Sequence, residues 1–387
     1  MLYFRMKKNI DFKSTFTALI FIVSVFGFSC KKEQVEHPIT EIAELKSVIY
    51  IGSSNNNFYA ISSVDGSEIW KYKGTEGFSY SDPLLHDGIV YTGDDGGNMY
   101  AFNSETGGVK WKYPTNFGIE SSPAIADGIL YFGSNDSYFY ALDAKDGRLL
   151  WKYKTGSGVS SSPLVNNGLV FFGGNDNYIY ALNAKSGKLM WNYATGGLMG
   201  HSSPVIKNNI LFIGSRDGNL YALYAINGLL KWTYYTGRSL EGSRPVVSDG
   251  LVYIAGGTVL FNAESSIKGM LYAIDEKTGK LRWDKSSERG MYSDATVSNN
   301  KVFISSDDGN FNAFNAKEGA NIWAERIIPN GSRSTVADGL IFVNGSGTRN
   351  FYALDENTGA VKWKSPILDG YSPKPCVVDS QGYIIQR

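Results

Sequence analysis

Short apolar runs separated by polar turn residues fill most of the chain. Residues 161–194 show the pattern clearly, with runs at 161–165 (SSPLV), 168–174 (GLVFFGG), 178–184 (YIYALNA) and 188–194 (KLMWNYA). Runs rich in Val, Ile, Tyr and Phe between Asn, Asp and Gly residues are typical of β-strands. We name these four predicted strands A, B, C and D in chain order. We expect them to form one antiparallel sheet joined by tight turns.

The four-strand unit recurs along the chain. Every tryptophan has an alanine ten residues earlier and a glycine four residues earlier, and successive tryptophans lie 40 or 41 residues apart, with one interval of 51. The tryptophans are Trp70, Trp111, Trp151, Trp191, Trp232, Trp283, Trp323 and Trp363. Because a sheet of about 40 residues cannot bury both of its faces alone, such repeats stack on one another. The chain is therefore predicted to be all-β, an eight-bladed β-propeller of four-stranded antiparallel blades.

Structural roles account for the repeated residues. A tryptophan on the outer strand D can fill the gap to the next blade, and the small alanine opposite leaves room for it. Burying about 200 Å² of indole is worth on the order of 5 kcal/mol. Gly187 falls where a bulged C–D turn needs a positive φ, which glycine adopts without a Cβ clash. These residues therefore need no active site to explain them.

The two ends of the repeat region are predicted to close the ring together. Residues 374–378 (KPCVV) match strand A, whereas residues 48–70 supply only strands B, C and D. A blade built from both ends removes the exposed sheet edges that favour aggregation. Residues 383–385 (YII) also resemble a strand, and the pattern assigns them no place.

The N-terminal 30 residues are typical of a lipoprotein signal peptide. Basic residues precede an apolar run at 16–28, which as a helix would reach roughly 20 Å, short of the ~30 Å core of a bilayer. A cleaved signal peptide is therefore favoured over a transmembrane helix. The run ends before Cys30 in a sequence similar to a loose bacterial lipobox, so we expect a lipid on Cys30; a chance cysteine is the alternative. Residues 31–46 are polar and read as a tether before a propeller domain at 47–387.

Charge and candidate chemistry narrow the possible functions. The chain has 37 basic and 37 acidic residues, which gives no indication of nucleic-acid binding. Its three histidines are scattered, and its two cysteines provide no disulfide framework. The Asp pairs at 94–95 and 307–308 suggest either calcium binding or hairpin turns, and we favour turns because Asp is expected at that point of the repeat. No phosphate loop, nucleophile elbow or zinc signature is present.

Candidate binding residues lie where the repeat varies. In an A–B–C–D blade, the B–C turns and the D–A connections emerge on one face, and the single insertion, about residues 257–268, falls in a B–C turn. Just before strand A most blades carry small residues, and the exceptions are Tyr80, Asp82, Glu120, His201, Glu241, Arg244, Tyr292, Asp294, Arg333 and Lys374. This rim either binds a small polar ligand or a peptide, or it is a solvated funnel with local ion pairs. Apolar residues in the D–A connections either mark a protein contact or fold inward; they are Phe78, Phe117, Leu198, Met199, Leu240 and Met291.

The repeat resembles a known family. The pattern Ala-x-Asp-x-x-Thr-Gly-x-x-x-Trp, seen at 273–283 and 353–363, is similar to the tryptophan-docking motif of quinoprotein-type (PQQ-like) eight-bladed propellers, and the resemblance covers residues 47–387. One branch of that family comprises pyrroloquinoline-quinone (PQQ) dehydrogenases, which carry an adjacent cysteine pair over the cofactor and a calcium site; no two cysteines are adjacent here. Another branch comprises BamB-like lipoproteins of outer-membrane protein assembly.

The BamB-like branch implies a non-enzymatic scaffold without cofactor or metal. Such a scaffold would be anchored in the outer membrane by its lipid, on the periplasmic side rather than the cell surface. Its partners would be other envelope proteins, among them the barrel-assembly machinery. A ligand-binding or sensory propeller of the periplasm or cell surface is the alternative, and a PQQ-dependent dehydrogenase is a remote one.

Overall fold

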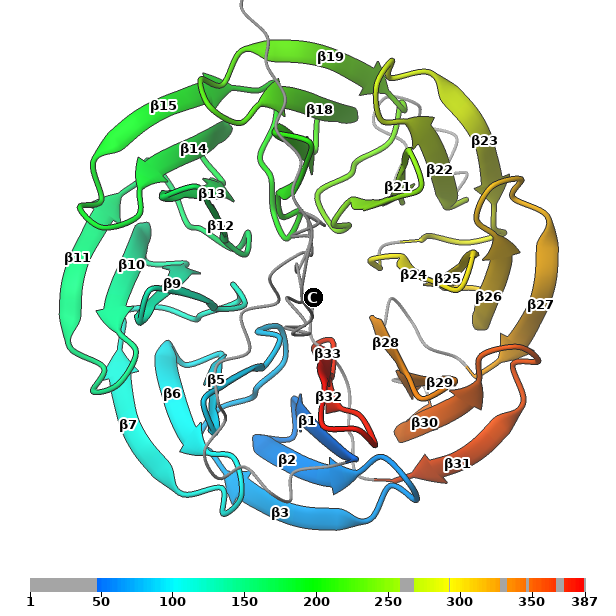
Figure 1. Cartoon of the computed structure of the whole chain (residues 1–387), viewed down its shortest axis with the longest axis horizontal. Helices are drawn as coiled ribbons and strands as arrows, with labels where there is room; N and C mark the ends of the chain where they lie inside the picture. The colour runs from blue at the N-terminus through cyan, green and yellow to red at the C-terminus, as the bar shows by residue number, and fades with distance from the viewer. Residues whose placement is uncertain are drawn as a thin grey trace, which may run out of the picture. The chain divides into compact units, whose positions relative to one another are not determined.

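The computed structural model describes residues 47–257, 268–291, 293–327, 333–345, 348–366 and 372–385. Within these residues, antiparallel sheets are arranged as eight blades around a common centre (Figure 1). We number the blades one to eight in chain order, beginning with the sheet that contains the first strand. The predicted all-β, eight-bladed propeller is confirmed. The part of the chain that the structure describes contains no helix long and apolar enough to cross a membrane.

Each blade runs from a short inner strand to a long outer strand. The inner A strands are β4 (Leu84–His86), β8 (Ala124–Ala126), β12 (Leu164–Asn166), β16 (Val205–Lys207), β20 (Val246–Ser248), β24 (Thr296–Ser298), β28 (Ser334–Ala337) and β32 (Cys376–Val378). The B strands are β1 (Val48–Gly52), β5 (Ile89–Gly93), β9 (Ile129–Ser134), β13 (Leu169–Gly173), β17 (Ile210–Gly214), β21 (Leu251–Gly256), β25 (Lys301–Ser305) and β29 (Leu340–Gly345).

The two outer strands of each blade carry the repeated alanine and tryptophan. The C strands are β2 (Asn57–Ser62), β6 (Asn98–Asn103), β10 (Tyr138–Asp143), β14 (Tyr178–Asn183), β18 (Asn219–Tyr224), β22 (Met270–Asp275), β26 (Asn310–Asn315) and β30 (Asn350–Asp355). The D strands are β3 (Glu68–Lys73), β7 (Val109–Pro114), β11 (Leu149–Lys154), β15 (Leu189–Ala194), β19 (Leu230–Tyr235), β23 (Leu281–Ser286), β27 (Asn321–Arg326) and β31 (Val361–Ser365).

The inner strands are shorter than the sequence pattern predicts. Strand A of blade four was expected at 161–165, but β12 covers only Leu164–Asn166. Pro163 has no N–H to donate to a ladder. The Ser161 hydroxyl instead accepts the N–H of Gly173 at 3.1 Å. A side chain therefore replaces the ladder bond at the top of the strand, and the chain at 161–163 is irregular.

The tryptophans dock neighbouring blades, as expected. In β11, Trp151 lies opposite Ala141 of its own blade and donates its indole N–H to the carbonyl of Ala184 in the C–D turn of the next blade, at 3.1 Å. The same bond recurs at each blade junction, including Trp363 to Ser63 at 3.1 Å across the closure. Each indole therefore contributes a hydrogen bond as well as buried area.

The turn glycine has a second role that the sequence did not reveal. Gly187 has φ +68, as expected for a bulged turn, and the register shift lies between Ala181 and Leu182. A Cβ at Gly187 would lie 2.6 Å from Cε3 of Trp151, which is closer than real contacts allow. The indole of the preceding blade therefore packs directly against the backbone of this glycine, in the space that a side chain would occupy.

The chain ends close the ring in blade one. Strand β32 pairs with β1 in antiparallel register, with Val377 opposite Ile49, which confirms the predicted closure. Residues 384–385, which the sequence left without a place, form β33 (Ile384–Ile385) and pair with β32 as a fifth, innermost strand (Figure 1). Blade one therefore reaches further toward the centre than the other blades.

The core consists of apolar layers between adjacent blades. Between blades three and four, for example, the rings of Phe139 and Phe172 stack at a centroid distance of 4.1 Å. The apolar residues of the D–A connections mostly join these layers: Phe78, Met199, Leu240 and Met291 are buried, and Leu198 is partly buried. Phe117 is the exposed exception. Of the two expectations for these residues, inward folding is therefore correct for most of them.

Candidate functional site

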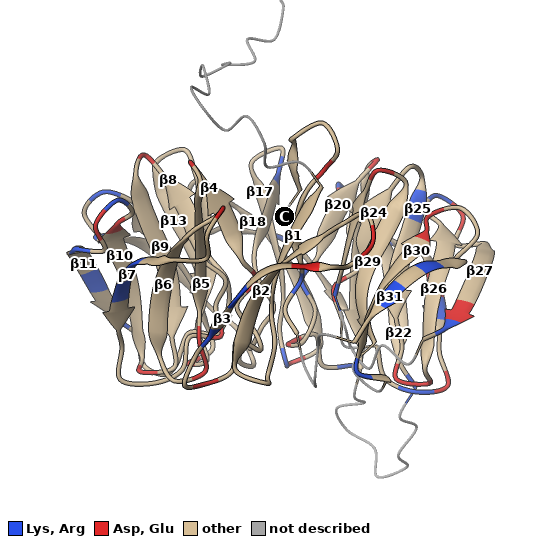
Figure 2. Cartoon of the chain, turned by 90° about the horizontal axis from the view of Figure 1, so that it is seen from below, with Lys and Arg blue, Asp and Glu red and all other residues tan. Residues whose placement is uncertain are grey.

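The ring has two loop-bearing faces. In the edge-on view the strands run between them, and most charged residues lie at the turns and on the outer strands (Figure 2). The N–H of Ile119, in a D–A connection, donates to the carbonyl of Asp94, in a B–C turn, at 3.1 Å. On the other face, the N–H of Ala225, in a C–D turn, donates to Asn209, in an A–B turn, at 2.9 Å. The predicted pairing of B–C turns with D–A connections is thus correct. We call this side the D–A face and the opposite side the A–B face.

The Asp pairs serve the B–C turns. One carboxylate oxygen of Asp94 accepts the backbone N–H of Asn98 at 2.6 Å, and Asp95 accepts the Ser79 hydroxyl at 2.6 Å. In the corresponding turn of blade seven, Asp308 accepts the N–H of Asn310 at 3.0 Å. Across the described ranges no group of three or more His, Cys, Asp or Glu side chains is placed to hold a metal ion. The turn interpretation therefore fits better than the calcium interpretation.

A ring of residues surrounds the channel, and each stands one or two positions before the first residue of an A strand that pairs with strand B. We call it the belt; its members are Asp82, Ser122, Ser162, Ser203, Arg244, Asp294, Arg333 and Lys374. Between serine members the bonding is regular: the N–H of Ser122 donates to Ser162 Oγ at 3.0 Å, and that of Ser162 donates to Ser203 Oγ at 2.8 Å. Each side chain thus accepts the backbone N–H of the belt residue in the preceding blade.

The two belt aspartates perform the same task with carboxylates. Asp82 Oδ1 accepts the N–H of Lys374 at 2.8 Å, and Asp294 Oδ1 accepts the N–H of Arg244 at 2.6 Å. Arg333 spans the channel between them, with Nη1 3.1 Å from Asp82 Oδ1 and Nε 3.2 Å from Asp294 Oδ2. Asp82 is only 2% exposed. A solvated funnel therefore does not describe this part of the rim, where the ion pairs are internal.

The remaining belt cations are less fully paired. Arg244 Nη2 lies 3.5 Å from Asp82 Oδ2 and donates to Ser162 Oγ at 3.4 Å, while its buried Nε has no hydrogen-bond partner. The structure gives the Lys374 amino group no ion pair with a described residue. Burial, and next the Arg244 guanidinium, lower the pKa of Lys374, while Asp82 acts in the opposite direction. The belt therefore holds three cations and two carboxylates.

The other predicted rim residues form separate groups. The rings of Tyr80 and His201 stack at 5.4 Å, and His201 Nε2 lies 3.6 Å from Glu120 Oε2. Burial, and next Arg333, lower the pKa of His201 despite the Glu120 carboxylate. Glu241 faces Arg216 at 3.9 Å, and its carbonyl accepts the N–H of Ser202, next to His201, at 2.8 Å. Tyr292, the insertion core at 258–267 and the lipidation candidate Cys30 lie outside the described residues.

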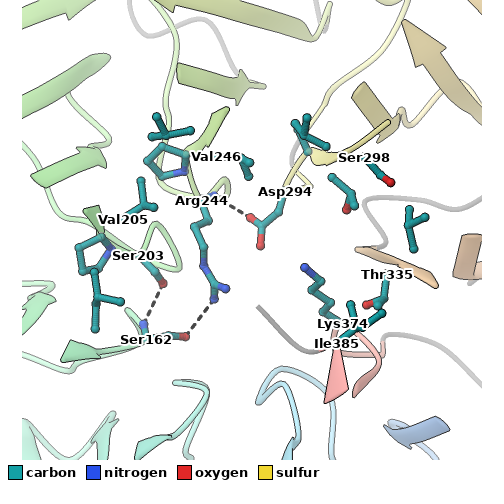
Figure 3. Close-up of a pocket in the computed structure, with 18 of the residues that line it drawn as sticks. Ser162, Ser203, Val205, Arg244, Val246, Asp294, Ser298, Thr335, Lys374 and Ile385 are labelled. Atoms are coloured by element: carbon teal, nitrogen blue, oxygen red, sulfur yellow. Dashed lines mark hydrogen bonds between the residues drawn. The ribbon is translucent and has the colours of Figure 1, made fainter. Parts of the chain in front are cut away.

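A cavity of about 480 Å³ lies inside the ring next to the belt. Arg244, Asp294 and Lys374 form its charged side, and residues of the inner strands form the rest of its wall (Figure 3). Ile385 of the extra strand β33 also contributes to the wall. Among the described residues, Lys374 is the belt cation that has no carboxylate within ion-pair distance, and the cavity lies beside it.

Sequence reasoning missed an exposed apolar cluster on the A–B face. It lies in the C–D turn of blade five, where Ile226 is 80% and Leu229 63% exposed, flanked by the partly exposed Tyr224 and Leu230. We call these four residues the blade-five patch. At the positions of Tyr224, Ile226 and Leu229 the other blades carry polar or small side chains, except Val64 in blade one. Comparing the repeats at their turns, rather than only at their rim, would have identified the patch.

The patch replaces a feature that stabilises the other turns. In blade four, the side chain of Asn183 accepts the backbone N–H groups of Lys185 and Ser186, at 3.2 and 2.9 Å. Tyr224 stands at the equivalent position and has no such acceptor. The blade-five turn keeps the backbone bond from the N–H of Gly228 to the Tyr224 carbonyl, and the Asn227 side chain accepts the N–H of Leu229 at 3.1 Å. At Tyr224 an exposed aromatic side chain therefore replaces a side chain, such as Asn183 in blade four, that accepts backbone N–H groups of the turn.

The blades, their tryptophan docking and the shared closing blade define the class: a PQQ-like eight-bladed β-propeller. A family model described as outer membrane protein assembly factor BamB matches residues 37–136, 115–265 and 236–372. The chain belongs to this BamB family. A curated relative, outer membrane protein assembly factor BamB of Yersinia pestis, is 31% identical over 119 residues, and the match spans 28% of this chain and only 30% of the relative.

Solved structures share the fold at low sequence identity. BamB from Moraxella catarrhalis matches with a TM-score of 0.64 at 19% identity, over 83% of this chain and 92% of its own. A europium-containing methanol dehydrogenase matches at 0.67 and 14% identity, over 77% and 81%. A quinohemoprotein alcohol dehydrogenase from Pseudomonas putida HK5 matches at 0.60 and 18% identity, over 80% and 69%. At these identities the likeness establishes the fold and does not choose between the functions.

The residues at the belt do not fit the cofactor that the dehydrogenase branch implies. The chain's two cysteines are Cys30 and Cys376, so no adjacent pair can cover a quinone. Cys376 is buried in blade one, and burial raises the pKa of its thiol to about 12. Asp82 and Asp294 are engaged by Arg333 and by backbone N–H groups rather than placed to hold calcium. The belt therefore lacks the groups with which those dehydrogenases hold PQQ.

Proposed function

We propose that this protein is a non-enzymatic scaffold of the bacterial envelope. It would bind a partner in outer-membrane protein assembly, the process after which its relatives, the assembly factors BamB, are named. Membership of the BamB family supports the class of function. The blade-five patch is the observation that carries the binding role. In this proposal, a lipid on Cys30 holds the protein at the periplasmic side of the outer membrane.

The patch has the character of a protein-docking surface. Large aliphatic side chains on a turn are unusual in this molecule, and burying one of them in a partner contributes about 1.5–3 kcal/mol. Two or three such anchors supply the apolar centre of a contact, and polar turns of the adjacent blades supply its rim. The backbone hydrogen bonds of the turn to Tyr224 form without a partner, so the surface is preorganised for binding.

The patch and the point where the chain enters the ring lie on the same face. The N–H of Ser63, in the C–D turn of blade one, donates to the carbonyl of Ser47 at 2.8 Å. Ser47 thus lies on the A–B face, as the blade-five patch does. The described chain therefore begins on the same face as the patch.

The test uses the repeat itself as the source of variants. Ile226→Lys with Leu229→Lys gives the blade-five turn the residues that blade four carries at Lys185 and Lys188. The fold tolerates lysine there, so the double variant should keep the wild-type thermal midpoint. Lys185→Ala with Lys188→Ala is the matched control on the neighbouring turn.

Crosslinking in intact cells, affinity purification through a C-terminal tag and mass spectrometry then identify the partner. We expect wild type and the Lys185/Lys188 control to recover a barrel-assembly protein, and the Ile226/Leu229 variant to lose at least nine-tenths of it. Recovery of only transport or surface proteins, or nothing above background, would contradict the assembly role. Undiminished recovery with the Ile226/Leu229 variant would show that the partner binds elsewhere.

A further inference from the structure

The central cavity combines a charged side with an apolar wall. Its volume is about 480 Å³, within the range of about 300–1,000 Å³ typical of small-molecule sites. The wall along five inner strands and β33 is largely apolar, and is formed chiefly by Leu164, Val205, Val246, Val297, Val336 and Ile385, with hydroxyl groups at Thr296, Ser298 and Thr335. The charged belt residues that line the cavity are Arg244, Asp294 and Lys374. Because each inner strand runs from the belt toward an A–B turn, the charged side faces the D–A face and the apolar wall extends toward the A–B face.

The charges at the belt are not balanced. Arg333 contacts both carboxylates, at 3.1 Å to Asp82 and 3.2 Å to Asp294. The Oδ1 atoms of these carboxylates also accept the backbone N–H groups of Lys374 and Arg244, so each carboxylate serves both a backbone group and a cation within the belt. Arg244 reaches Asp82 only at 3.5 Å. Three cations thus share two carboxylates, which leaves one positive charge without a counter-ion in the belt.

The excess charge is directed into the cavity. The Lys374 side chain points from β32 toward Arg244 and Asp294, across the space that the inner strands enclose (Figure 3). Its amino group has no ion pair with a described residue. Burial and the neighbouring guanidinium lower the pKa of Lys374, as expected for an ammonium group that is desolvated beside another cation. An anion in contact with this amino group would remove that penalty.

We propose that this cavity binds a small organic monoanion, a medium-chain aliphatic carboxylate, as a ligand distinct from the protein partner. The carboxylate pairs with the amino group of Lys374 and with the guanidinium of Arg244, since both residues line the cavity. The hydrocarbon chain lies along the valine wall toward the A–B face. A single negative charge matches the single excess cation, whereas a dianion or a neutral lipid would leave a charge uncompensated in a largely buried site.

The position of the site follows from the ring closure. Lys374 precedes β32, which enters blade one from the C-terminal end of the propeller, and Ile385 lies in the additional strand β33. Arg244 comes from blade six, on another part of the ring. The ligand would therefore contact the closing blade and blade six together. Its binding should accordingly stabilise the closed ring, because a ligand that binds the folded state raises the free energy of unfolding.

Titration calorimetry of the full mature protein with sodium octanoate tests this inference. We expect saturable binding of one octanoate per protein, and binding at least tenfold weaker for acetate, which lacks the chain, and for octanol, which lacks the charge. Lys374→Met keeps the apolar stem and removes the charge, and should weaken octanoate binding at least tenfold. Lys145→Met, on an exposed turn of blade three, is the control and should bind as wild type does.

Each outcome decides the inference. Absence of saturable octanoate binding, or octanol binding as tightly as octanoate, would overturn it. Unchanged octanoate binding by Lys374→Met with a wild-type circular dichroism spectrum would do the same. If Lys374→Met does not fold, Arg244→Gln takes its place, because it removes the second carboxylate partner; unchanged affinity there would also overturn the proposal. The proposed scaffold role is independent of these results.

Discussion

Each turn glycine supports the tryptophan of the preceding blade, and this contact allows a quantitative prediction. Gly187 and Gly168 lie in the same blade with nearly the same backbone angle, φ +68 and φ +73. A Cβ at Gly187 would lie 2.6 Å from Trp151, whereas a Cβ at Gly168 would meet nothing within 4 Å. Gly168→Ala therefore measures the cost of the positive φ alone, and Gly187→Ala measures that cost together with displacement of the indole.

The expected magnitudes differ enough to be resolved. An alanine in the left-handed region costs about 1–2 kcal/mol, offset by about 0.4–1 kcal/mol from the stiffer unfolded chain. Gly168→Ala should thus lower the free energy of unfolding by about 1 kcal/mol. Displacing a packed ring adds about 1–3 kcal/mol, so Gly187→Ala should cost about 3 kcal/mol. Trp151→Ala alone should cost about 3–5 kcal/mol, because it leaves a cavity and removes the bond to Ala184.

A double-mutant cycle separates the two contributions. In the Trp151→Ala background the added methyl group meets no indole, so Gly187→Ala should then cost only as much as Gly168→Ala. The assay is equilibrium unfolding in urea followed by far-ultraviolet circular dichroism, with the slope of each transition checked for constancy. Equal costs for Gly187→Ala and Gly168→Ala in the wild-type background, or a Gly187→Ala cost that Trp151→Ala leaves unchanged, would refute the proposed contact.

Three further predictions concern single residues. Burial, and next Arg333, lower the pKa of His201 in the folded protein. At pH values between that lowered pKa and the ordinary value of about 6.5, His201 is protonated in the unfolded chain but not in the folded one, so acidification lowers the free energy of unfolding. The thermal midpoint should therefore fall more between pH 7 and pH 5 in wild type than in His201→Gln, and equal falls would contradict this assignment. Burial raises the pKa of Cys376 to about 12, so in Cys30→Ser protein iodoacetamide should label Cys376 at pH 8 only after unfolding; rapid labelling of the folded protein would show that the thiol is accessible. Cys30→Ser should release the protein from membranes in cell fractionation, and continued sedimentation with membranes would argue against lipidation.

Most of the fold was predictable, because each repeat contains the strand, turn and docking residues that specify its own blade. Strands B, C and D of blade four were placed within a residue of β13, β14 and β15. The inner strand was misplaced because Pro163 has no N–H to donate and the Ser161 hydroxyl takes the place of a backbone acceptor. Strand propensity does not indicate such a replacement of backbone pairing by side-chain bonding. Strand β33 was recognised only as a strand-like run, since its partner β32 belongs to a blade assembled from both ends of the domain.

The candidate site was only partly predictable. Five of the ten rim residues proved to be belt members, and the sequence identified them simply as exceptions to a small-residue position. The ion pairs among these belt residues could not be derived in the same way, because the local sequence does not indicate which belt residue contacts which. The blade-five patch was overlooked although its signal, three apolar residues at polar turn positions, is present in the repeat.

The sequence by itself determined the eight blades, their turns and their docking residues, because these depend on contacts at short range or at one fixed repeat spacing. Only the tertiary structure decided that Arg333 reaches Asp82 across the channel, although 251 residues separate them. It also decided that Lys374 is left without a carboxylate within ion-pair distance among the described residues. The physical reason is that closure of the ring brings the inner ends of all blades within side-chain reach of one another, so the pairing depends on the geometry of the whole ring.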